Sequence, residues 1–164
     1  LYISPRLKSF PAFIQGGGQE GGYRSGTEAT PAIFAFAAAA EAGMQTFRQD
    51  TAREKELLNS LCEKLSALPD LVLTGAHEAP HILSLSVPGV PTQNTINILQ
   101  DKGICVSAGS ACAKGHRSHV LTAMNLSPER MDGSFRVSLC RDTTWEELEV
   151  LLDTLKNDIL PRRR

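Results

Sequence analysis

Apolar residues recur at helical spacing over two long stretches in the first part of the chain. The first stretch repeats every three or four residues, the spacing of one helix face, and contains Ile33, Phe36, Ala40, Met44 and Phe47. The second continues to Pro69 and contains Leu57, Leu58, Leu61, Cys62 and Leu65. This pattern predicts one long helix, or two helices with a break at residues 43–50. We expect Thr30 to cap it, Pro31 to open it, and Cys62 to lie in the core.

The rest of the chain predicts short strands alternating with helices. Strands are expected at residues 71–74, 82–87, 104–107 and 135–139, and the last alternates cleanly, with Arg136 and Ser138 on one face. Helices are expected after Thr92, across residues 118–124, and after a capping box at residues 143–146. This order predicts an α/β fold of α+β-like character. In it, a small, mainly antiparallel sheet carries helices packed on one face.

The composition suits a soluble domain and excludes several classes of partner. The chain has 164 residues, of which 41% are hydrophobic, and its net charge is −1. That charge gives no electrostatic reason to expect nucleic acid or a membrane surface as partner. No apolar run approaches the ~20 residues of a membrane span. Four cysteines without close pairing argue against a disulfide scaffold and favour a reducing, cytoplasmic setting.

Cys112 lies among small residues that cannot fill a core. The segment 106–115 reads Val-Ser-Ala-Gly-Ser-Ala-Cys-Ala-Lys-Gly. Nearby cations favour a reactive thiolate, and four basic side chains follow within seven residues: Lys114, His116, Arg117 and His119. Cys112 is therefore a candidate nucleophile, although a small residue in a surface loop has the same surroundings. A metal site is a third reading, with Cys105, Cys112, His116 and His119 as ligands. Its spacing matches no zinc pattern, and Cys105 is expected to alternate into the core.

Two further features have a functional and a structural reading. Arg136, in the middle of a strand, could bind a carboxylate through its planar fork, or it could simply face solvent or form a structural salt bridge. The glycine-dense segment 16–22 predicts a loop. With Arg24, Ser25 and Thr27 after it, this loop could hold a phosphate, although a plain linker is an alternative.

Four motifs in order resemble those of one enzyme family. They are Gly-Gly-Gly-Gln-Glu-x-Gly-x-Arg-Ser-Gly-Thr-Glu at 16–28, Val-Ser-x-Gly-Ser-Ala-Cys at 106–112, Ser-His-Val-Leu at 118–121 and Gly-Ser-x-Arg-x-Ser-Leu at 133–139. Together they resemble the C-terminal part of a group I cysteine desulfurase of the NifS/IscS type, in the aminotransferase class V family. The resemblance covers essentially the whole chain.

The resemblance implies a fold-type I enzyme that uses pyridoxal 5'-phosphate. Such an enzyme converts L-cysteine to L-alanine and keeps the sulfur as a persulfide on a cysteine, here Cys112. Arg136 would bind the substrate carboxylate. Thr27 and Arg24 would lie on the phosphate side of the cofactor, across a homodimer. A sulfur-acceptor or scaffold protein would then take the sulfur for iron–sulfur cluster assembly or for another thio-cofactor.

The resemblance also implies a domain division and a missing residue. Residues 1–30 would end the large-domain region, and residues 31–164 would form the C-terminal small domain with its connecting helix. The cofactor's Schiff-base lysine follows a histidine in this family. None of the lysines of this chain does so; they are residues 8, 55, 64, 102, 114 and 156. We therefore expect the chain to be a fragment that is inactive by itself. The alternative is a cofactor-free sulfur-relay or interaction module that uses Cys112.

Overall fold

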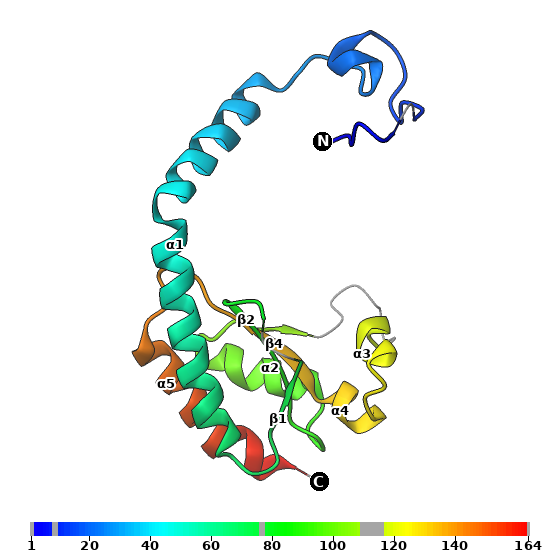
Figure 1. The fold of residues 1–164 in the computed structure, drawn as a ribbon. Coiled ribbons are helices and arrows are strands. Elements are labelled where there is room, and N and C mark those ends of the chain that lie inside the picture. Colours follow the sequence, from blue (N-terminus) through cyan, green and yellow to red (C-terminus); the bar gives the residue numbers. More distant parts are fainter. Residues whose placement is uncertain (1, 8–9, 76–77, 109–116, 164) are drawn as a thin grey trace. The chain divides into compact units, whose positions relative to one another are not determined.

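The computed structural model describes residues 2–7, 10–75, 78–108 and 117–163. The chain forms two compact units, Leu1–Gln45 and Thr46–Arg164. Helix α1 (Thr30–Ser66) begins in the first unit and ends in the second (Figure 1). It is one helix of 37 residues, so the predicted stripes join without a break and Thr30 is already helical. Within the described residues, no helix is long and apolar enough to cross a bilayer.

The glycine-dense segment of the first unit contains a short 3-10 turn, which the expectation of a plain loop missed. The turn spans Gln19–Gly22, and Glu20 and Gly21 adopt left-handed backbone angles with φ of 52° and 64°. A parallel bridge joins Ile14 to Arg24, and the rings of Phe10 and Tyr23 stack with centroids 4.7 Å apart. These contacts give the segment a defined local structure despite its glycine content.

The second unit contains a four-stranded sheet in which every pairing is antiparallel. Its strand order is β1-β2-β4-β3 (Figure 1), and the strands are β1 (Val72–Thr74), β2 (Ile82–Ser86), β3 (Ser107–Ala108) and β4 (Ser134–Ser138). Side chains alternate between the faces of a strand, and in β4 the core side carries buried Phe135 and Val137. Arg136 and Ser138 point to the other face and are exposed, as the sequence predicts.

Helices bury one face of this sheet and complete a leucine-rich core. They are the second part of α1, α2 (Thr92–Asp101), and α5 (Trp145–Thr154), which continues through a π-helical turn, Leu155–Ile159. The core joins Leu61 of α1, Leu85 of β2 and Leu99 of α2 to Phe135 and Leu148. Burial of this apolar surface is the main driving force for the fold. The predicted α+β-like domain is therefore confirmed, with an antiparallel sheet and helices packed on it.

Two short helices follow the segment that contains Cys112. They are α3 (His119–Ala123) and α4 (Pro128–Asp132). Each begins after a serine whose side chain accepts a hydrogen bond from a backbone N–H, a common N-cap arrangement. Ser118 accepts from the Leu121 amide, and Ser127 accepts from the Arg130 amide.

Three further local expectations were wrong, besides that of Thr30 as a cap. Residues 104–106 lie outside β3, so strict alternation does not apply to them, and Cys105 is exposed instead of buried. The capping box is one residue later than predicted, because the Thr144 side chain accepts from the Glu147 amide while the Glu147 carboxylate accepts from the Thr144 amide. Thr92 is the first residue of α2 and not its cap, and its hydroxyl is used elsewhere.

Candidate functional site

The candidate site is built around Arg136 in the interior strand β4. Its position pairs with Ser84 of β2 on one side and with Ser107 of β3 on the other. Residues directly opposite each other in an antiparallel pair share a face. Arg136 therefore lies between two serines on the face of the sheet opposite the leucine core.

No carboxylate of the described residues forms an ion pair with the Arg136 guanidinium. The ion pairs in that part of the chain join Lys102 to Asp158, Arg117 to Asp132, Arg141 to Asp142 and Arg163 to Asp70. Within the described residues, Arg136 therefore has no acidic partner for the structural salt bridge that the sequence left open. An exposed guanidinium between two hydroxyls presents a planar set of N–H donors that suits a carboxylate from another molecule.

Cys112 lies outside the described residues, as do Lys114 and His116, but the ends of its segment are described. β3 leads into this segment, and Ser107 precedes Cys112 by five residues. The register places Ser107 beside Arg136. The chain therefore enters the segment of the candidate nucleophile from a strand that pairs with the strand of the candidate carboxylate-binding residue.

Arg24 and Thr27 belong to the first unit, where the glycine-dense segment folds back on itself. The Ser25 hydroxyl donates to the Gly17 carbonyl oxygen at 2.7 Å, and the Gly26 amide donates to Gln19 Oε1 at 3.2 Å. Gly26 has a φ of 104°, which favours glycine. Arg24 and Thr27 are both exposed on this folded segment. A guanidinium and a hydroxyl are donors of the kind that hold a phosphate, so this donor set fits a phosphorylated cofactor.

The metal reading gains no support from the described part of the chain. No group of three or more His, Cys, Asp or Glu side chains there is arranged to hold a metal ion. Two of the four candidate ligands, Cys112 and His116, lie outside that part. Cys105 and His119 are described, and both are exposed.

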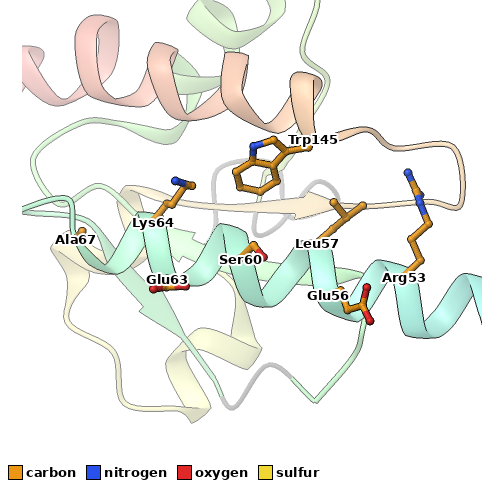
Figure 2. Close-up of a pocket in the computed structure, with 8 residues that line it drawn as sticks. All are labelled: Arg53, Glu56, Leu57, Ser60, Glu63, Lys64, Ala67 and Trp145. Atoms are coloured by element: carbon orange, nitrogen blue, oxygen red, sulfur yellow. The ribbon is translucent and has the colours of Figure 1, made fainter.

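A groove between α1 and α5 lies apart from these residues, with a volume of about 730 Å³. Figure 2 shows Lys64 and Arg53 on α1 and Trp145 above them. The Lys64 ammonium lies 5.7 Å from the Trp145 ring centroid, a cation–π distance. The Arg53 guanidinium donates to the carbonyl oxygens of Arg141 and Thr143. These contacts hold α1 against α5 and are structural.

Comparison with known proteins identifies the family. Residues 9–151 match the aminotransferase class-V family. The chain belongs to that family. Over 169 residues it is 33% identical to a cysteine desulfurase from Nostoc sp., covering 100% of this chain and 42% of that protein. It is also 34% identical to the cysteine desulfurase IscS of Shewanella piezotolerans, covering 97% of this chain and 40% of that protein.

A solved structure of similar fold agrees with this assignment. The NifS-like protein from Rickettsia africae matches with a TM-score of 0.78 at 29% identity, covering 88% of this chain and 38% of that one. The chain therefore spans about two fifths of the length of the relatives it matches. The resemblance found in the sequence motifs is confirmed at the level of family and fold.

Sequence reasoning found Arg136 but missed the side chains around it. Ser84 and Ser107 were readable only as polar positions in short strands, because a single sequence does not give the register between strands. The bidentate pair of Arg117 with Asp132 was also missed. Its two residues are 15 positions apart and belong to no motif that marks an ion pair.

Proposed function

We propose that this chain provides the sulfur-accepting and substrate-binding part of a pyridoxal-phosphate-dependent cysteine desulfurase. The observation that carries the proposal is the register of β4 with β3. It places Arg136, with no internal carboxylate partner among the described residues, beside the strand that leads to Cys112. The family match and the similarity to proteins named cysteine desulfurases support the same reaction.

Arg136 would hold the α-carboxylate of L-cysteine through its planar fork, with Ser84 and Ser107 on either side. The Cys112 thiolate would bond to the substrate sulfur while the carbon–sulfur bond of the substrate breaks. The electron pair of that bond stays on carbon, which takes up a proton and becomes the methyl group of L-alanine. The sulfur remains on Cys112 as a persulfide. This division of roles separates binding from nucleophilic attack.

Pyridoxal phosphate, when bound, supplies the electron sink for breaking the carbon–sulfur bond. Within this chain, Arg24 and Thr27 would hold its phosphate from across a homodimer. None of the chain's lysines directly follows a histidine, the context of the family's cofactor lysine. We therefore expect residues 1–164 by themselves to form no alanine from cysteine. Alanine production by this chain alone would contradict that expectation.

The test uses the full-length gene product that contains this chain, loaded with cofactor. We expect L-alanine from L-cysteine, and a gain of one sulfur atom on Cys112 by peptide mass spectrometry. Cys112→Ser should abolish both. Cys140→Ser is a matched control, because Cys140 is exposed and has no role in the proposed chemistry. Full alanine production by Cys112→Ser would refute the proposal, and sulfur on Cys112 without alanine would favour the cofactor-free relay.

The sulfur would pass from Cys112 to an acceptor or scaffold protein in the cytoplasm, for iron–sulfur cluster assembly or another thio-cofactor. A matching assay follows labelled sulfur from L-cysteine to an added acceptor. Transfer should require Cys112 and leave Cys140→Ser unaffected.

A further inference from the structure

A bidentate ion pair joins the end of the Cys112 segment to the beginning of β4. Arg117 is the first described residue after residues 109–116. Its Nε donates to Asp132 Oδ1 and its Nη2 to Asp132 Oδ2, both at 2.9 Å. Asp132 ends α4, two residues before β4 begins. Two parallel charge-assisted bonds fix direction as well as distance.

The backbone that carries Asp132 is itself held from another element. The Thr92 hydroxyl, at the start of α2, lies 2.8 Å from the Asp132 carbonyl oxygen and 2.9 Å from that of Ser134. Its single proton is shared between these two acceptors. Between them, the Gly133 carbonyl oxygen accepts from the Val87 amide at 3.1 Å. The Asp132 carboxylate therefore projects from a fixed stretch of chain.

The other end of the Cys112 segment meets the same stretch. Ala108, the last residue of β3, pairs with Phe135, and Arg117 pairs with Asp132. Both ends of the segment are thus attached within residues 132–135, immediately before Arg136. The two attachments differ in kind, because one is a backbone pairing and the other is made by side chains alone.

The ion pair contributes little to the stability of the fold. The side chains of Arg117 and Asp132 are 49% and 53% exposed, and exposed pairs are screened by solvent. What the pair does is join Arg117, two residues before α3, to Asp132 at the end of α4. Such a contact affects the position of a neighbouring segment more than the free energy of unfolding.

We propose that Arg117 and Asp132 are positioning residues for sulfur transfer. Their ion pair holds Arg117, where the chain leaves the Cys112 segment, beside the residues that lead into β4, and the proposed effect is to help the thiolate meet a substrate whose carboxylate Arg136 binds. The inference rests on the proposed function and adds two residues that do not touch the substrate. Reaction rates respond steeply to small misplacements of reacting atoms, so loss of the pair should slow sulfur transfer without weakening substrate binding.

The test compares Arg117→Met and Asp132→Asn in the cofactor-loaded, full-length gene product. We expect kcat for alanine formation and the rate of persulfide formation on Cys112 to fall by about tenfold. KM for L-cysteine should stay within about twofold, because Arg136 is intact, and Tm should fall only slightly, as for other exposed pairs. The double variant should be no worse than either single variant. Arg141→Met is the matched control, since Arg141 forms an exposed pair with Asp142 elsewhere.

Two further measurements separate positioning from a structural role. The charge swap Arg117→Asp with Asp132→Arg should recover part of the lost kcat. High salt screens exposed pairs, so it should reduce kcat of the wild type more than that of Arg117→Met. An unchanged persulfide rate in both single variants would overturn the inference, as would a fall in kcat that follows a fall in Tm.

The outcomes also separate this inference from the proposed function. If the wild type forms no alanine, or Cys112→Ser is fully active, the proposed function fails and the positioning role fails with it. If the wild type is active, Cys112→Ser is inactive and Arg117→Met equals the wild type, only the positioning role fails.

Discussion

Ser107 of β3 lies directly opposite Arg136 of β4 in the antiparallel register. This pairing relates the strand that leads to Cys112 to the strand that carries the candidate carboxylate ligand. Backbone pairing holds β3 and β4 together, and the leucine core packs on the opposite face of the sheet. The Arg136 side chain takes part in neither. Arg136 can therefore be changed without removing a core contact, which makes its role testable.

Arg136→Met in the full-length gene product should raise KM for L-cysteine by about 30-fold or more, because charge-assisted hydrogen bonds to the carboxylate are lost. Steady-state alanine production over a range of L-cysteine concentrations measures this change. Arg136→Lys should recover only part of it, since an ammonium lacks the planar fork. An unchanged KM in Arg136→Met, with Arg141→Met as control, would refute the carboxylate role.

Gly133→Ala should lower the free energy of unfolding by about 1–3 kcal/mol. A Cβ at this position would overlap the Val87 carbonyl oxygen, which is backbone and cannot rotate away. Gly133 has an ordinary φ of −99°, so the expected loss is steric. Urea unfolding measures it. Gly43→Ala is the control, because a Cβ there meets open space within α1 and should stabilise the helix. Equal stability of the two variants would contradict this.

Alkylation of the described cysteines should follow their burial. Burial raises the pKa of the Cys62 thiol and reduces its thiolate fraction, whereas Cys105 and Cys140 are exposed. At pH 8 in the folded protein, iodoacetamide should modify Cys105 and Cys140 several-fold faster than Cys62. Peptide mass spectrometry over time gives the rates, and denaturant should remove the difference. Faster modification of Cys62 than of Cys105 and Cys140 in the folded state would contradict the packing of Cys62 against the core.

Thr144→Ala should lower the free energy of unfolding by about 1 kcal/mol, because it removes one half of the capping box at α5. Thr144→Ser keeps the accepting oxygen and should retain most of the stability. Thermal unfolding followed by circular dichroism compares the two. If both variants lose the same amount, the methyl group and not the cap accounts for the effect.

The stabilisation from Asp132 should disappear in acid. The Arg117 guanidinium lowers the pKa of the Asp132 carboxyl in the folded state. The contribution is therefore fully present above the unfolded pKa of about 3.9 and is lost as the pH falls through the lower folded value. The small advantage of the wild type over Asp132→Asn at pH 7 should shrink below about pH 4. Urea unfolding at both pH values checks this, with Asp101→Asn as control. An advantage that grows in acid would reverse the sign of the argument.

The sequence predicted the elements of the second unit well because their hydrophobic periods are clear. The alternation across residues 135–139 placed Arg136 on the correct face, and the stripes that end at Leu65 gave α1. Cys105 was placed wrongly, since alternation applies only inside a paired strand and β3 contains just Ser107 and Ala108. The capping box was misplaced by one residue because two threonines stand side by side.

The surroundings of the candidate site were beyond sequence reasoning. The flanking of Arg136 by Ser84 depends on strand register, which is a tertiary property. The Arg117–Asp132 pair depends on how α3 and α4 return to β4. Residues far apart in sequence meet there, and a single sequence carries no signal for such a meeting.

The position of β3 at the edge of the sheet has a consequence for evolution. Among the described strands β3 has one neighbour, β4, so the chain beyond it can gain or lose residues without breaking pairings with a second described strand. Insertions and deletions after Ala108 should therefore leave Arg136 and the leucine core in place while changing the length of the segment that contains Cys112. The same domain can therefore carry segments of different length between β3 and α3 without any change in its core.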